Sequence, residues 1–168
     1  SFTESRGAWA LEIHGGGAER SRLKAATRSL AGIVLGEVLD EAEYVKRLLT
    51  CSACLVTQTH GVGANFLPSK LLPALATGTP VLAVCDESSP LGREVQRGAF
   101  GAIVPPDDRS SLRQVLGKWL ARPELMAQLG RNALKWAERF ERANILGQYE
   151  DELRRLTGLT ASKEMSAF

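Results

Sequence analysis

The sequence lacks the features that mark membrane-spanning, disulfide-rich and nucleic-acid-binding proteins. It has three cysteines, a net charge of only +2, and lysines and arginines dispersed among acidic residues. No apolar run approaches the roughly 20 residues of a transmembrane helix, and the opening SFTESRGAW has no apolar signal core. Without a basic stripe, nucleic acid is not an expected partner. The hydrophobic share of 44% and charged share of 24% are typical of one soluble globular domain.

The cysteines do not form a recognisable metal or disulfide framework. Cys51 and Cys54 form one CxxC, but no second pair or suitably spaced histidine completes a zinc site. We interpret both, and Cys85, as small buried residues at strand ends. Free thiols are typical of a reducing compartment, so we expect a cytoplasmic protein.

Strand-like and helix-like segments alternate along the chain until about residue 104, and a run of helices follows. This alternation predicts an α/β fold, a Rossmann-like doubly wound parallel sheet with C-terminal helices. The predicted strands cover 9–13, 31–35, 52–57, 80–84 and 102–104, and the predicted helices cover 18–30, 40–49, 68–78 and 90–98, with a helix break at Arg122 and Pro123.

The stretch 57–85 is the most informative, because it predicts a strand, a glycine-broken loop, a helix and a buried strand. Its loop carries His60, Gly61 and Gly63. In α/β proteins, phosphates bind where a parallel strand ends and a helix begins. We therefore expect a crevice at the carboxyl ends of the strands, lined by the loops 14–17, 36–40 and 59–70.

Ser69 and Lys70 are the best candidates for an anion site, because they fall in the first turn of a predicted helix. Backbone N–H groups lack partners there, Lys70 adds a charge and Ser69 a hydroxyl donor. The alternative is that Ser69 only caps the helix and Lys70 is a solvated surface residue.

Other polar residues are more ambiguous. The glycines 15–17 allow close backbone approach to a ligand, but they do not form a GxGxxG fingerprint and fit a tight turn equally well. His14 and His60 could bind a phosphate or sugar, or lie exposed. Asp86 and Glu87 could face the crevice, although capping of the next helix is the favoured role. No nucleophile–base pair, HExxH motif or P-loop is visible.

Seven sequence blocks, in order and at consistent spacing, resemble a known family. These blocks are GGGAERSRL (15–23), VLGEV (34–38), CLVTQ (54–58), PSKLL (68–72), ALATGTPVLA (74–83), GAFGAIVPPDD (98–108) and RPELMAQLGRNALKWAERF (122–140). Together they look like the C-terminal half of a GT-B glycosyltransferase. The retaining family 4 type, and within it the PSKLL subgroup of polysaccharide sugar transferases, is the most similar, over about residues 11–156.

The resemblance implies a domain that holds a nucleotide diphosphate sugar as donor substrate. The backbone at 36–38 would contact the base, and residues 65–71 would hold the diphosphate and sugar. We expect no metal or other cofactor, and catalytic residues stay unassigned. The candidate substrate-binding residues are Gly16, Gly36, Val38, His60, Gly61, Gly63, Asn65, Ser69, Lys70 and Leu71.

The sequence also departs from the family pattern. The first strand–helix unit, which in relatives supplies an Arg and a Lys to the diphosphate, has no visible counterpart, and neither has the N-terminal acceptor domain. The Glu-x7-Glu motif is replaced by Asn65 and Pro73. Proline inside the predicted helix should kink it or be confined to its first turn.

These observations predict a nucleotide-sugar-binding domain over 1–156 and a frayed tail over 157–168. As part of a hexosyltransferase, it would transfer a sugar to a glycan or lipid-linked acceptor in polysaccharide or cell-envelope biosynthesis. Its partner would be the N-terminal acceptor domain, where any membrane association would reside, and the isolated domain is expected to be inactive.

Apolar surface around 145–153 could support a weak homodimer of that isolated domain. The main alternative is a non-catalytic nucleotide-sugar-binding or interaction domain derived from the GT-B fold. A nucleotide-sugar epimerase is less favoured, because the sequence shows no Glu/His cluster for its chemistry.

Overall fold

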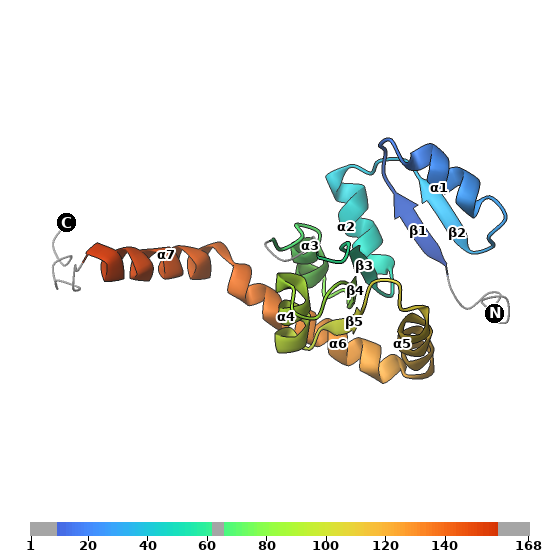
Figure 1. Cartoon of the computed structure of the whole chain (residues 1–168). Coiled ribbons are helices and arrows are strands. Elements are labelled where there is room, and N and C mark those ends of the chain that lie inside the picture. The colour runs from blue at the N-terminus through green and yellow to red at the C-terminus, as the bar shows by residue number, and fades with distance from the viewer. Residues whose placement is uncertain (1–9, 62–65, 158–168) are drawn as a thin grey trace.

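The computed structural model describes residues 10–61 and 66–157, and it confirms an α/β protein in which strands and helices alternate (Figure 1). The elements in chain order are β1 (Leu11–His14), α1 (Arg20–Thr27), β2 (Ile33–Gly36), α2 (Glu41–Thr50), β3 (Cys54–Thr57), α3 (Leu71–Ala76), β4 (Val81–Val84), α4 (Pro90–Gly98), β5 (Gly101–Val104), α5 (Arg109–Ala121), α6 (Pro123–Ala137), a short 3-10 helix (Glu138–Phe140) and α7 (Arg142–Thr157).

The strands form two parallel sheets rather than one continuous sheet. One sheet pairs β1 with β2, and the other has the order β3-β4-β5. Within the described residues, no strand pairing joins β1 to β3. In the doubly wound order 3-2-1-4-5-6, another strand lies at this position.

One face of the β3-β4-β5 sheet packs against α3, α4 and α6. The buried side chains on this face come from alternate strand positions, as the two-residue period of a strand requires. Phe100, the residue just before β5, is fully buried and stacks at a tilt against Trp136 of α6, with ring centroids 6.4 Å apart. The other members of this cluster are Val56, Leu71, Ala74, Leu75, Val81, Ala83, Cys85, Leu91, Val95 and Ala133.

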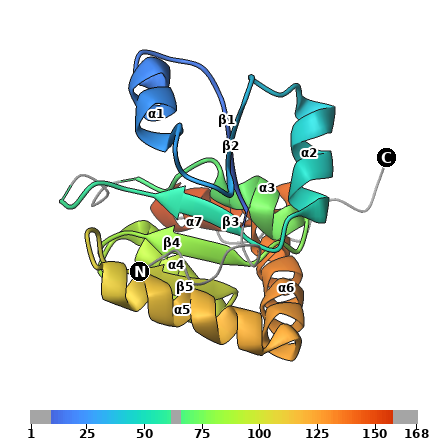
Figure 2. The ribbon, with the colours of Figure 1, turned by 90° about the vertical axis from the view of Figure 1, so that its right-hand side faces the viewer.

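The opposite face is covered by α5 and the start of α6 (Figure 2). Leu82 and Val104 from the strands pack there with Trp119 and Leu129 from the helices. Leu55 lies in register beside Leu82 on this same face, yet it is 41% exposed. The cover of the sheet therefore thins toward β3, its unpaired edge.

One predicted side-chain cap and two predicted proline effects are confirmed at the helix starts. Asp40 accepts a hydrogen bond from the Glu43 backbone N–H at 2.8 Å and starts α2. Pro123 opens α6 directly after α5 ends, which confirms the predicted break. Pro73 is the third residue of α3, so it is confined to the first turn as expected. It needs no N–H partner in that position.

The interpretation of the cysteines is confirmed for one residue and wrong for another. Cys85 is fully buried in the core. Cys54 is half-buried, and desolvation together with the neighbouring Cys51 raises the pKa of its thiol to about 11. Cys51 is exposed, because α2 ends at Thr50 and the chain turns back toward β3 at that point.

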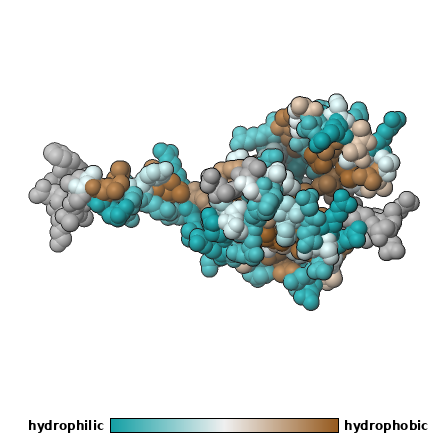
Figure 3. Space-filling model, in the orientation of Figure 1, coloured by the Kyte–Doolittle hydropathy of each residue, from teal (hydrophilic) through white to brown (hydrophobic). Residues whose placement is uncertain are grey.

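The last helix, α7, extends away from the rest of the domain (Figure 1). It has no buried residue, and its apolar side chains are visible on the surface (Figure 3). Leu146, Tyr149, Leu153 and Leu156 are between 49% and 68% exposed. This exposure confirms the predicted apolar surface near 145–153, but dimerisation through it stays a prediction. No helix within residues 10–61 and 66–157 has the length and apolar character needed to cross a membrane.

The close approach of β4 and β5 gives a test of this packing. A Cβ at Gly101 would lie 1.9 Å from the carbonyl oxygen of Val81, its partner across the ladder. We expect Gly101→Ala to lower the free energy of unfolding by about 3 kcal/mol. Gly117 of α5 is the control, because a Cβ there meets nothing within 4 Å. Gly117→Ala should stabilise by about 0.5–1 kcal/mol, and urea unfolding measures both. Equal stability of the two variants would contradict the packing.

Candidate functional site

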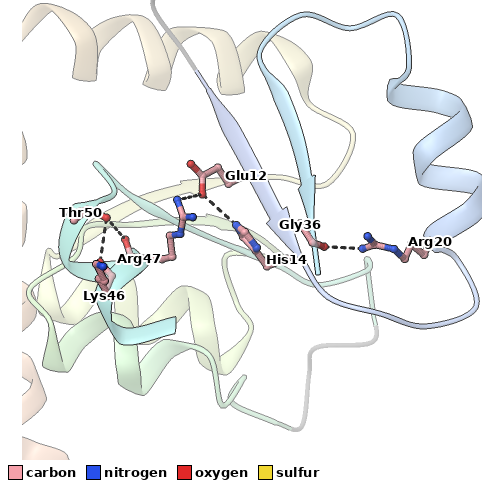
Figure 4. Close-up of polar contacts among 7 residues, drawn as sticks. All are labelled: Glu12, His14, Arg20, Gly36, Lys46, Arg47 and Thr50. Atoms are coloured by element: carbon pink, nitrogen blue, oxygen red, sulfur yellow. Dashed lines mark hydrogen bonds and ion pairs between the residues drawn. The ribbon is translucent and has the colours of Figure 1, made fainter. Parts of the chain in front are cut away.

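The loops that follow β1 and β2 are held together by Arg20, the first residue of α1. Its Nη1 donates to the carbonyl oxygen of Gly15 at 2.6 Å and to that of Gly36, also at 2.6 Å (Figure 4). Its Nη2 donates to Glu37 at 2.5 Å. One guanidinium therefore fixes the carboxyl ends of two neighbouring strands, and two of the three predicted loops are brought together.

Gly36 has a packing role besides the predicted contact with a nucleotide base. A Cβ at this position would lie 2.1 Å from Nδ1 of His14, so the imidazole occupies the space of a side chain. The His14 Nε2 lies 3.1 Å from Glu12, which also accepts from Arg47 of α2 at 3.2 Å (Figure 4). The Nδ1 atom is buried without a partner among the described residues. His14 thus belongs to a polar contact between β1 and α2.

Gly16 and Val38 are close neighbours at this end of the sheet. A Cβ on Gly16 would lie 3.6 Å from a methyl group of Val38, and Val38 is 72% exposed. An exposed apolar side chain beside a glycine loop can pack against a flat, weakly polar ring. The position of Val38 is therefore compatible with the predicted contact with a base.

The ends of β3 and β4 are joined by Asp86. Its carboxylate accepts hydrogen bonds from the His60 Nδ1 at 2.5 Å and from the Gly61 backbone N–H at 2.8 Å. The Gly61 N–H and then the His60 side chain hold the pKa of Asp86 below its usual range. The favoured role of Asp86 as a helix cap is wrong, because Ser89 caps α4 by accepting from the Gly92 N–H at 3.1 Å.

Ser69 and Lys70 form an exposed turn just before α3, which begins at Leu71 rather than at 68. Leu71 is fully buried, and its N–H donates to the Pro68 carbonyl at 3.0 Å. It contributes to the core and offers no free donor. Lys70 lies within electrostatic reach of Cys54, since its charge opposes the burial that raises the pKa of that thiol.

Two candidates, Gly63 and Asn65, lie outside the described residues. Among residues 10–61 and 66–157, no hydrogen bond or ion pair joins the segment 59–70 to the two loops held by Arg20. Arg20, which organises the site, was not among the sequence candidates, and Asp86 was considered only as a residue facing the crevice or capping the next helix. Arg20 had a signal, because a cation in the first turn of a helix opposes the helix dipole and needs another partner.

A cavity of about 930 Å³ lies away from all these residues, between α4, α6 and α7. It is lined by helix residues such as Arg97, Trp136 and Gln148. Ligands of open α/β sheets bind at the carboxyl ends of the strands. The loops joined by Arg20 and Asp86 therefore remain the candidate site.

Comparisons with known proteins agree on the fold. No protein-family model matches the sequence. An exopolysaccharide phosphotransferase of Streptomyces coelicolor is 27% identical over 143 residues, which are 85% of this chain and 15% of that relative. The chain thus spans a small part of the relative's length.

Three solved structures are similar to most of the chain. WaaG, a glycosyltransferase of lipopolysaccharide biosynthesis, has a TM-score of 0.64 and 17% identity, and the match covers 86% of this chain and 37% of WaaG. Sucrose-phosphate synthase from Thermosynechococcus elongatus has a TM-score of 0.67 and 24% identity, with 89% of this chain and 39% of that one covered. HepE of Anabaena, in complex with UDP, has a TM-score of 0.67 and 16% identity, with 90% of this chain and 41% of that one covered. The chain has the fold of the Rossmann-like domains of GT-B glycosyltransferases.

The contacts of Arg20 predict that its removal loosens the β1–α1–β2 unit. We expect Arg20→Ala to destabilise the protein by about 2 kcal/mol, because two carbonyl oxygens lose a charged donor. Arg22→Ala is the control, since the Arg22 side chain is 82% exposed and pairs with Glu19, the residue just before α1. Thermal unfolding and amide exchange of residues 11–36 measure the effect. Equal exchange in both variants would contradict the role of Arg20.

Proposed function

We propose that this chain is the donor-binding domain of a retaining, hexosyltransferase-type enzyme that takes its sugar from a nucleotide diphosphate sugar. The observation that carries the proposal is the fold, shared with GT-B glycosyltransferases, whose strand ends hold the loops 14–17, 36–40 and 59–61. One structural neighbour was crystallised with UDP, and the curated relative acts on exopolysaccharide by its name. Both support a nucleotide-linked donor and a polysaccharide product.

The chemistry would depend on stabilising the leaving group. When the bond between the sugar and the nucleotide breaks, negative charge builds up on the β-phosphate. The Lys70 ammonium and the Ser69 hydroxyl, both exposed beside α3, would stabilise this charge. Val38 and the backbone of Gly36 would hold the base at the end of β2.

The acceptor would bind to a further domain of a longer protein, as would any group that activates it. The chain spans 37–41% of the solved glycosyltransferases that it resembles. The unpaired edges of β1 and β3 would take the first strand of the complete sheet. The chain spans only 15% of the curated relative. The phosphotransfer reaction in that relative's name is therefore not assigned to this domain.

The alternative is a domain that binds a nucleotide sugar without catalysis. The family motif has a carboxylate where this chain has Pro73, which lies in the first turn of α3 and has no side-chain acceptor. Without that acceptor, the ribose of the nucleotide would lose a hydrogen bond and bind more weakly. Turnover of a nucleotide sugar by the longer protein would exclude this alternative.

Binding of a nucleoside diphosphate tests the proposal. With UDP, GDP or ADP, we expect one nucleotide to raise the melting temperature, by an amount equivalent to about 2.7 kcal/mol at a concentration 100 times its Kd. Lys70→Ala should weaken that binding about tenfold, since a charge contact of this kind contributes about 1.4 kcal/mol.

Lys118→Ala is the matched control, because Lys118 is an exposed lysine of α5. Calorimetric titration measures each affinity. The proposal would be contradicted if no nucleotide stabilised the wild-type chain, and the role of Lys70 would be contradicted if both variants bound equally.

A further inference from the structure

A single carboxylate connects the loops that follow β3 and β4. The two strands are in register to their last residues, Thr57 and Val84, so their following loops leave the sheet side by side. Asp86 uses one oxygen for the His60 Nδ1, at 2.5 Å, and the other for the Gly61 N–H, at 2.8 Å. Both bonds join residues more than twenty positions apart, which a helix cap would not do.

The base of the same loop is also fixed. Gln58 follows β3 directly, is 8% exposed, and donates from its Nε2 to the Phe66 carbonyl at 3.5 Å. The contact is long, but it brings the two ends of the loop together. His60 therefore lies two residues after the anchored Gln58 and is itself held by Asp86.

The carboxylate also determines which nitrogen of His60 carries a hydrogen. An ionised carboxylate only accepts hydrogen bonds, so the hydrogen lies on Nδ1. Asp86 stays ionised at neutral pH, because the Gly61 N–H and His60 keep the pKa of its carboxyl group low. In the neutral imidazole, Nε2 then has a lone pair and accepts a hydrogen bond. The His60 side chain is 82% exposed, and Nε2 has no partner within the described ranges.

We propose that Asp86 positions His60 so that Nε2 accepts a hydrogen bond from a hydroxyl group of the donor's sugar. This inference rests on the proposed function and adds to it a residue, His60, that recognises the sugar. An ionised diphosphate has no hydrogen to give to a lone pair, and it is repelled by the neighbouring Asp86 carboxylate. A sugar hydroxyl is neutral and donates, so the pair distinguishes the sugar part of the donor from its diphosphate part.

The inference is tested by comparing two ligands on the same variants. The probes are the nucleoside diphosphate that binds the wild-type chain and the same diphosphate with glucose or N-acetylglucosamine attached. We expect His60→Phe, which keeps a ring without an acceptor, and Asp86→Ala to weaken nucleotide-sugar binding about tenfold. Binding of the bare nucleoside diphosphate should stay within about twofold. These changes correspond to about 1.4 and 0.4 kcal/mol.

Two control variants complete the comparison. Glu87→Ala removes the adjacent exposed carboxylate, which contacts Gln96 and not His60, and should leave both affinities unchanged. Lys70→Ala should weaken both ligands alike. If His60→Phe weakened both ligands equally, or neither, sugar recognition by His60 would be overturned. A phosphate contact would produce the first result and a purely structural ion pair the second.

A second measurement needs no ligand, so it separates this inference from the proposed function. The sequence has only two histidines. Imidazole 15N spectra can therefore be assigned by the signal that disappears in His60→Phe. We expect the neutral His60 ring to carry its hydrogen on Nδ1 in the wild type and to shift toward the Nε2–H form in Asp86→Ala. An unchanged tautomer would overturn the role of Asp86. If the tautomer shifted in Asp86→Ala but no nucleotide bound to the wild-type chain, the proposed function and the sugar recognition by His60 would both be contradicted. The positioning of His60 by Asp86 would still be confirmed.

Discussion

A parallel sheet is stable only when both of its faces are covered, and this requirement organises the structure. The β3-β4-β5 sheet has α3, α4 and α6 on one face and α5 on the other, with Phe100 and Trp119 as the large side chains of the two cores. Helices that cover the faces leave only the ends of the strands open. The carboxyl ends therefore become the place where loops gather and where polar groups can meet a ligand.

The β1-β2 sheet satisfies the same requirement less completely. Its strand residues are exposed or half-buried, and a polar contact from Glu12 to Arg47 links it to α2. Leu55, on the unpaired edge of the other sheet, is also exposed where its neighbour Leu82 is buried. Exposed apolar side chains on the strands include Leu11 of β1, Val34 of β2 and Leu55 of β3. In a doubly wound sheet, another strand lies between the edges formed here by β1 and β3.

Two charged side chains of opposite sign, Arg20 and Asp86, hold the loops of the candidate site in place. Arg20 binds backbone carbonyls at the ends of both β1 and β2, whereas Asp86, which follows β4, binds an imidazole and a backbone N–H in the loop after β3. Each is one charged side chain that links the ends of two neighbouring strands. Such bonds are stronger than those between neutral groups and fix loops that have no ladder of their own. Arg20 positions the backbone of Gly36, where contact with a base is predicted, and Asp86 positions the His60 ring.

The element order, the strand positions to within two residues, the Asp40 cap and the helix break at Pro123 can be predicted from the amino-acid sequence, because they depend on local periodicity and on neighbouring residues. The sequence also pointed to the loops as the site. Local patterns do not predict that the strands form two sheets, that α3 starts at Leu71 with its N–H already bonded, or that Cys51 is exposed. Nor do they predict that Asp86 hydrogen-bonds to His60 and the Gly61 N–H instead of capping α4. Those outcomes depend on which distant groups compete for the same hydrogen bond or the same buried space, and neighbouring residues in a sequence do not specify that competition.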